Sequence, residues 1–274
     1  MQPASQKTAS ILRENWLRVS AEVAQACHAA GRVTDQVQVV GVTKYVAPEF
    51  AWQLAQAGCH VLAENRPQGL WEKADYCDQQ SRAQPVDVHH SSSDVRSPSD
   101  AAPSDSAHSA SLPQAAHALQ WHLIGHLQRN KLKRTLPIIS LLHSLDSLRL
   151  AQAISREAVA QQLRCRLLLE VNVTSDSSKT GMSIDDTRRV LELADELPGI
   201  EFCGLMAMSS LDATADRARR EFQRVSELRD ELQQEFPGLT LRELSMGMSG
   251  DFREAIAAGA TLVRIGSSLW QGIL

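Results

Sequence analysis

The feature that most constrains the fold is an eightfold alternation of short apolar runs with longer amphipathic segments. Segments with apolar residues at helical spacing separate nearly all of the runs, for example 48–58, 146–162, 183–197 and 215–234. This alternation predicts a single α/β domain folded as a (β/α)8 barrel of the TIM type. A doubly wound open sheet is the alternative, because alternation alone does not show that the sheet closes. The eight apolar runs lie at 37–43, 60–63, 121–125, 140–145, 166–173, 201–208, 239–246 and 261–266.

The length of the chain fits one such barrel. Its 274 residues, 43% of them hydrophobic, are enough for a (β/α)8 domain of about 250 residues. We place that domain at 7–272 and expect it to begin with a helix over 7–30 that Gly31 ends.

Composition limits the compartment and the partners. The formal net charge of -4 argues against a nucleic-acid surface, and no apolar run reaches the roughly 20 residues of a membrane span. The first ten residues lack the apolar stretch of a signal peptide, and the five scattered cysteines favour a reducing compartment. We expect a cytoplasmic protein, a monomer or weak dimer, that binds neither nucleic acid nor membrane.

One segment, 83–118, interrupts the alternation. It is rich in Ser, Ala, Asp, Pro and His and holds almost no large apolar residue, so we expect a disordered insertion. Its histidines, His89, His90, His108 and His117, could be metal ligands. Solvated loop histidines are the interpretation we favour, because no pattern of cysteines or carboxylates accompanies them.

The stretch from Leu244 to Gly272 contains two turns of small residues at predicted strand ends. Ser249 is placed to cap a short helix, and Gly266 and Ser267 open the second turn. Free backbone N–H groups at two such turns form a plausible phosphate cradle. Two ordinary turns that use Gly and Ser for their conformational freedom are the alternative.

Two basic residues lie near the seam of the predicted barrel. Lys44 ends the first strand and Arg264 lies near the end of the last, so closure brings them to one rim. A partly desolvated Lys44 could form a Schiff base with an aldehyde, although a lysine reaching into solvent is the simpler interpretation. Together with the cradle, the pair suits an anionic aldehyde cofactor or a phosphorylated sugar.

Other predicted strand ends are also polar. Each is a weak signal, because barrel loops need polar helix caps in any case. Asp146 is at least as well explained as a cap of the next helix, and Met206 and Met208 are expected to pack at the barrel top. These strand-end residues are Glu64, Asn65, Arg66, His122, His126, His143, Ser144, Asp146, Asn172, Lys179, Met206 and Met208.

Seven segments, taken in order along the chain, resemble the pyridoxal phosphate homeostasis protein family. They are VGVTKYVAP, AENRPQ, WHLIGHLQRNK, HSLDS, VNVTSDSSKTGM, GLMAM and LSMGMSGDFREAIAAGATLVRIGSS. The resemblance spans 7–272 except the Ser-rich segment and implies a single barrel similar to the N-terminal domain of alanine racemase. Departures are few: Val46 replaces a second basic residue, Pro48 is displaced by one position, Ala63 replaces a glycine and Ser267 a threonine.

The resemblance also implies a cofactor, pyridoxal 5'-phosphate (PLP), held as a Schiff base on Lys44. It assigns the phosphate to Ser249, Gly266 and Ser267, with Ser245 or Met246 as further contacts. Arg264 would face the pyridine nitrogen, Asn65 would approach the ring, and Lys179 is a second amine that could reach the cofactor.

These assignments favour a PLP carrier for storage or delivery, with apo PLP-dependent enzymes as partners. Arg264 would stay protonated and leave the ring nitrogen unprotonated, which supports carbanion chemistry weakly. The chain ends at Leu274, so we expect no second domain to bring an opposing tyrosine, and Tyr45, if it continues the strand, points to the other face. A racemase-like PLP enzyme is the alternative, and a barrel that binds a phosphorylated metabolite without a Schiff base is a third.

Overall fold

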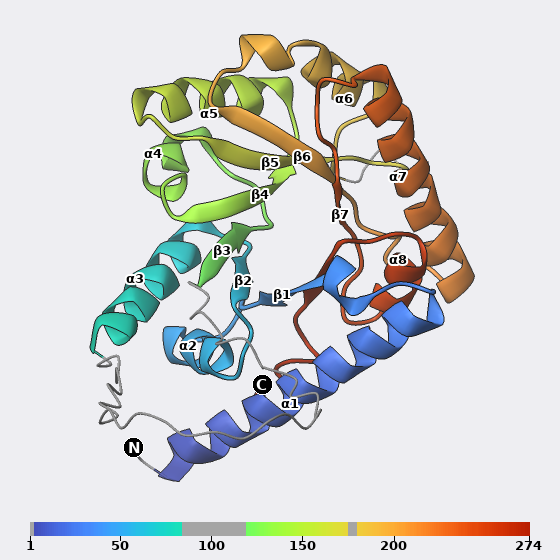
Figure 1. The fold of residues 1–274 in the computed structure, drawn as a ribbon. Coiled ribbons are helices and arrows are strands. Elements are labelled where there is room, and N and C mark those ends of the chain that lie inside the picture. Colours follow the sequence, from blue (N-terminus) through green and yellow to red (C-terminus); the bar gives the residue numbers. More distant parts are fainter. Residues whose placement is uncertain (1–2, 84–118, 175–179) are drawn as a thin grey trace, which may run out of the picture.

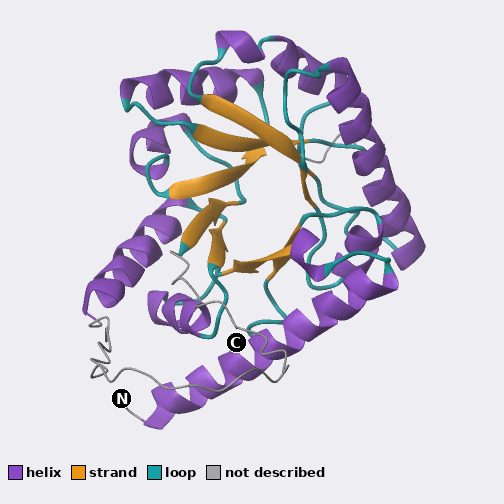
Figure 2. Ribbon diagram, in the orientation of Figure 1, coloured by secondary structure: helices purple, strands orange, loops and turns teal. Residues whose placement is uncertain are grey.

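The computed structural model describes residues 3–83, 119–174 and 180–274. Its eight strands are parallel and close into a barrel in the order β1 to β8 (Figures 1 and 2). The predicted (β/α)8 barrel is confirmed, and closure rules out the open sheet. The strands are β1 (Gln38–Val42), β2 (Val61–Glu64), β3 (Gln120–Leu123), β4 (Ile139–Leu145), β5 (Cys165–Glu170), β6 (Ile200–Met206), β7 (Glu243–Ser245) and β8 (Leu262–Ile265).

Helices surround the strands as an outer ring (Figure 2). Ser147, Ser183 and Thr214 begin three of them as N-caps, each accepting a hydrogen bond from a backbone N–H in the first turn. The helices are α1 (Pro3–Ala29), α2 (Pro48–Gln56), α3 (Pro67–Ala83), α4 (Leu132–Thr135), α5 (Leu148–Ala160), α6 (Ile184–Glu192), α7 (Ala215–Glu235) and α8 (Phe252–Ala257). Short 3-10 turns lie at Thr34–Gln36, Arg129–Lys131 and Ala194–Glu196.

The N-terminal helix completes the ring. Helix α1 packs against both α2 and α8 and covers the seam between β1 and β8 (Figure 1). It ends as predicted, with Gly31 in the left-handed region at φ 68°. Its polar face also holds the loop after β8: Asn15 Nδ2 donates to the carbonyls of Leu269 and Gln271, and Arg18 Nη2 donates to that of Ser268.

Apolar side chains form two layers. The larger layer lies between strands and helices, and a smaller cluster that includes Val40, Leu141, Leu168 and Leu262 fills the barrel interior. Residues two apart on a strand face the same side, so His143 and Arg264 share the interior with Leu141 and Leu262. The interior is therefore partly polar.

One expectation from the sequence needs adjustment, and another is not tested. The run at 239–246 forms a strand only over Glu243–Ser245. Gln233 explains the difference, because its side chain donates to the Leu239 carbonyl and accepts from the Leu241 N–H, which holds that segment as a turn. The insertion from residue 84 to 118, with its four histidines, lies outside the described residues.

The cysteines and the helices bear on compartment and membrane. All five cysteines are free and buried, as expected of small core residues. Among the described helices, none combines the length and the apolarity that crossing a bilayer requires.

Candidate functional site

Lys44 lies at the carboxyl-terminal mouth of the barrel, in a turn and not in the strand. Strand β1 ends at Val42, and the exposed Lys44 follows Thr43, which is fully buried. Tyr45 adopts φ 72°, a left-handed conformation that costs a residue with a side chain about 1–2 kcal/mol. Its ring returns beside the lysine, with Lys44 Nζ 5.5 Å from the ring centroid. Tyr45 does not continue the strand, which ended at Val42, so the condition under which it would point to the opposite face is not met.

A buried ionic cluster anchors this turn to the end of β2. The Glu64 carboxylate pairs with Lys73 of α3, and both side chains are less than one-tenth exposed. Glu64 also accepts from Thr43 Oγ1 at 3.0 Å and from the Asn65 N–H at 3.1 Å. One carboxylate thus ties the turn after β1, the turn after β2 and helix α3 together.

Asn65 occupies the rim beside the lysine turn. Its carbonyl packs so closely on Gly125 that a Cβ there would lie 2.2 Å from the oxygen, so the position requires glycine. Asn65 and Tyr45 line the same cavity of about 440 Å³. The structure therefore brings Asn65 to the Lys44 side of the mouth.

The two Gly/Ser turns meet, as the phosphate-cradle hypothesis requires. Ser249 Oγ accepts from the backbone N–H groups of Gly266 (3.2 Å) and Ser268 (3.4 Å), so donors of the second turn converge on the first. Gly247 makes the approach possible, with φ 82° and a position where a Cβ would lie 2.6 Å from that of Ala255.

Ser249 is not the helix cap that the sequence suggested. Helix α8 begins at Phe252 with Asp251 as its N-cap. Asp251 Oδ1 accepts from the Met248 N–H at 2.6 Å and Oδ2 accepts from Ser209 Oγ at 2.6 Å. The chain makes a tight turn over Met248–Asp251, which moves the helix start two residues further along and leaves the Ser249 hydroxyl facing the second turn.

The remaining predicted contacts lie at different depths. Ser267 is exposed beside the cradle, whereas Met246 is fully buried in the layer between strands and helices. Ser245 is also fully buried, and its hydroxyl contacts Arg264 and His143 inside the barrel. Lys179 lies outside the described residues.

Arg264 is buried below the rim. Strand β8 pairs with β1 so that Arg264 is level with Val40, four residues before Lys44. Its guanidinium donates from Nη1 to the carbonyl and the hydroxyl of Ser245, both at 2.7 Å, and from Nη2 to the carbonyl of Ala207 at 3.0 Å. Burial lowers the pKa of Arg264 to about 10, which leaves it charged at neutral pH.

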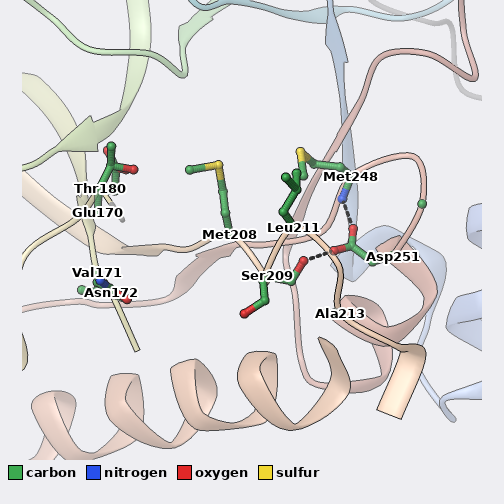
Figure 3. Close-up of a pocket in the computed structure, with 12 residues that line it drawn as sticks. Glu170, Val171, Asn172, Thr180, Met208, Ser209, Leu211, Ala213, Met248 and Asp251 are labelled. Carbon is green, nitrogen blue, oxygen red and sulfur yellow. Dashed lines mark hydrogen bonds between the residues drawn. The ribbon is translucent and has the colours of Figure 1, made fainter. Parts of the chain in front are cut away.

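A cavity of about 410 Å³ opens beside the cradle, between the loops that follow β5, β6 and β7 (Figure 3). Glu170, Thr180 and Met208 line one side, and Met248 and Asp251 line the other. Met206 packs at the barrel top as expected, but Met208 is 43% exposed at this cavity. Its volume lies in the range of small-molecule sites.

Glu170 is the acidic group of this cavity that sequence reasoning missed. Burial raises the pKa of its carboxyl, while a hydrogen bond from Thr180 and the charge of Arg264 act in the opposite direction. The signal was present, because a glutamate closes the apolar run of β5 two residues after the inward-facing Leu168. Asp146 is not a helix cap: Ser147 caps α5, and Asp146 pairs with His126 Nδ1 at 2.8 Å.

Comparison with known proteins places this architecture in a class. Residues 29–272 match the family model described as alanine racemase, N-terminal domain. The barrel, the lysine in the turn after β1 and the paired Gly/Ser turns thus belong to a protein of the alanine racemase N-terminal type.

Similarity to individual proteins identifies the family within this class. A pyridoxal phosphate homeostasis protein of Aquifex aeolicus is 32% identical over 257 residues, covering 94% of this chain and 96% of its own. The crystal structure of an unknown protein from Bifidobacterium adolescentis is 31% identical with a TM-score of 0.80, covering 98% and 97%. PipY of Synechococcus elongatus, solved with PLP bound, is 28% identical with a TM-score of 0.68, covering 90% and 99%. The chain belongs to the pyridoxal phosphate homeostasis protein family.

Proposed function

We propose that this protein binds pyridoxal 5'-phosphate covalently through the Lys44 amine and holds it in the cytoplasm for storage or for delivery to apo-enzymes. The observation that carries the proposal is the meeting of an exposed lysine turn, a buried arginine and two Gly/Ser turns at one end of the barrel. Family membership and the PLP-bound relative support it.

The residues of the site fit this cofactor. The N–H groups of Gly266 and Ser268 already converge on one hydroxyl oxygen, as they would on a phosphate oxygen. Ser267 adds an exposed hydroxyl next to them. Three of the five N–H groups of Arg264 donate to described residues, and the other two are the ones that would serve a ligand.

When bound, PLP supplies an aldehyde that lysine can capture and a ring that can accept electrons. The protein's own residues favour retention over turnover. Arg264 is a permanent donor, so it would offer an N–H to the ring nitrogen, where it supplies no carboxylate to protonate that nitrogen. The Glu64 cluster fixes the turn that carries Lys44, and the Tyr45 ring covers one side of the amine.

The experiment that tests the proposal is borohydride trapping followed by peptide mapping. Purified protein mixed with PLP should show a visible band that borohydride removes, with the label on the peptide that contains Lys44. Lys44→Ala should lose the band and the label while keeping its circular dichroism spectrum. Lys133→Ala, which removes another exposed lysine, is the matched control and should behave as wild type. Labelling of Lys179 in place of Lys44 would contradict the assignment.

A further inference from the structure

The barrel interior contains a continuous line of four polar side chains from four different strands. Arg264 of β8 donates to Ser245 Oγ of β7 at 2.7 Å. Ser245 Oγ lies 2.8 Å from His143 Nδ1 of β4, and His143 Nε2 lies 2.9 Å from His122 Nδ1 of β3. All four residues are at most 4% exposed. Buried polar groups that connect in this way normally have a defined donor direction.

Donor and acceptor chemistry fixes that direction. A guanidinium cannot accept, so Ser245 Oγ is the acceptor for Arg264. The serine proton then needs an acceptor of its own, and His143 Nδ1 is the one within reach among the described residues. The opposite arrangement, with His143 Nδ1–H donating to Ser245, would leave a buried hydroxyl proton unsatisfied.

The direction continues through the second histidine. With Nδ1 accepting, a neutral His143 carries its proton on Nε2 and donates it to His122 Nδ1, so His122 is protonated on Nε2. Both rings are neutral: burial lowers the pKa of His143 well below its ordinary value, and burial with the nearby charge of Arg166 lowers that of His122 to about 3.

The line ends at the opposite face of the barrel from Lys44. His122 lines an open cavity of about 820 Å³ at the amino-terminal ends of the strands, together with Arg166, Arg242 and Glu243. Its Nε2 has no hydrogen-bond partner among residues 3–83, 119–174 and 180–274, so this N–H is directed to solvent in the cavity. Each donor therefore points away from Arg264, from the cofactor end to the basal end.

We propose that His143, oriented by His122, is a positioning residue that locks the Ser245 hydroxyl as an acceptor for Arg264 and so fixes the guanidinium presented to the cofactor site. The other two acceptors of Arg264 are the backbone carbonyls of Ser245 and Ala207. The hydroxyl is the one acceptor of the three that can rotate, and His143 holds its proton away from the guanidinium. The last step, presentation to PLP, rests on the proposed function.

The sharpest test uses three variants and a control. His143→Leu removes the acceptor. His143→Gln keeps it, because the amide oxygen can accept from Ser245 while the amide nitrogen donates to His122. Ser245→Ala removes the hydroxyl itself. Leu168→Ala creates a cavity in the same interior layer but does not touch the four polar side chains, so it controls for simple loss of core packing.

Nitrogen-15 NMR reads the geometry without cofactor. Wild type should show both histidines neutral, with the proton on Nε2. Slowly exchanging Arg264 Nη–H signals should persist in wild type, His143→Gln and Leu168→Ala and disappear in His143→Leu and Ser245→Ala. PLP affinity should fall about tenfold in the latter two, as for one hydrogen bond to a charged group, and recover in His143→Gln.

Several outcomes would overturn the inference. A proton on Nδ1 of His143 in wild type would show that the donor direction is the reverse of the one inferred. This measurement tests the inference even if His143→Leu does not fold. If the Arg264 signals were unchanged in His143→Leu, the histidines would contribute only to core packing. The same would follow if Leu168→Ala lost the Arg264 signals to the same extent. If wild type bound no PLP while the Arg264 signals followed the expected pattern, the proposed function would be wrong, but the positioning of Arg264 by His143 would still be supported.

Discussion

Removing the cation of the Glu64–Lys73 pair should lower the free energy of unfolding more than removing one partner of a surface ion pair. The reason is that the cluster is buried and holds the turn that carries Lys44. In Lys73→Met the Glu64 carboxylate stays 3% exposed and loses its only ion-pair partner among the described residues. Breaking a buried pair on one side costs about 3–5 kcal/mol. Glu64 keeps hydrogen bonds from Thr43 and Asn65, so we expect the lower end, about 3 kcal/mol.

The assay is chemical unfolding followed by circular dichroism, comparing midpoints at equal slope. Adding Glu64→Gln to Lys73→Met should restore most of the loss, because a neutral amide no longer needs the ammonium. Its oxygen can accept from the Asn65 N–H while its NH2 donates to Thr43 Oγ1, whose own proton goes to the Ala63 carbonyl. Arg224→Met is the control, since its pairing with Glu231 is exposed and should be worth less than about 1 kcal/mol. A loss in Lys73→Met no larger than that control, or a double variant no better than the single, would refute the reasoning.

Four further outcomes are expected. Ser249→Ala combined with Ser267→Ala should weaken PLP binding at least about tenfold by titration, since hydrogen bonds to a charged group contribute about 1.5–3 kcal/mol each; unchanged affinity would exclude the cradle. Because the pKa of Glu170 is raised above 4.5 in the fold, wild type should lose stability relative to Glu170→Gln as pH rises from that value towards neutrality, and a difference that is flat with pH would show the carboxyl to be solvated. Excision of 85–117 should leave thermal stability and PLP content nearly unchanged, because that segment lacks core-forming residues; a large drop in either would assign it a packing role. Holo-protein incubated with alanine or serine should show no racemisation or decarboxylation above free PLP, and turnover that Lys44→Ala abolishes would favour the racemase-like alternative.

The sequence was sufficient for the architecture and for the neighbourhood of the site. Strand and helix periods predicted the barrel, and closure then paired β8, which carries Arg264, with β1, the strand that the Lys44 turn follows. The cradle hypothesis, one of two interpretations of the Gly/Ser turns, required the turns to meet, and they do. These features follow from local patterns and from a topology with few solutions, which is why a single sequence can indicate them.

The features that the sequence did not predict depend on the sign of a backbone φ angle, on a tight turn and on the register of the strands. The sign of φ at Tyr45 decides on which side of Lys44 its ring lies, and nothing in its residue type indicates a left-handed conformation. The two-residue shift of the α8 start depends on a tight turn that Asp251 closes. The contact of His143 with Ser245 joins strands three positions apart around the barrel, so it requires the register of every strand between them.

The position of α1 has a consequence for how the molecule assembles. The helix that covers the seam is synthesised long before the groups it must meet, since the hydrogen bond from Asn15 to Leu269 spans 254 residues. Contacts of such long range form late, because the loop they close is costly in chain entropy. The same contacts hold the loop that begins at Gly266, so we expect the second Gly/Ser turn and the seam to reach their final arrangement together. We therefore expect the second Gly/Ser turn to become ordered only in chains whose loop after β8 has docked on α1.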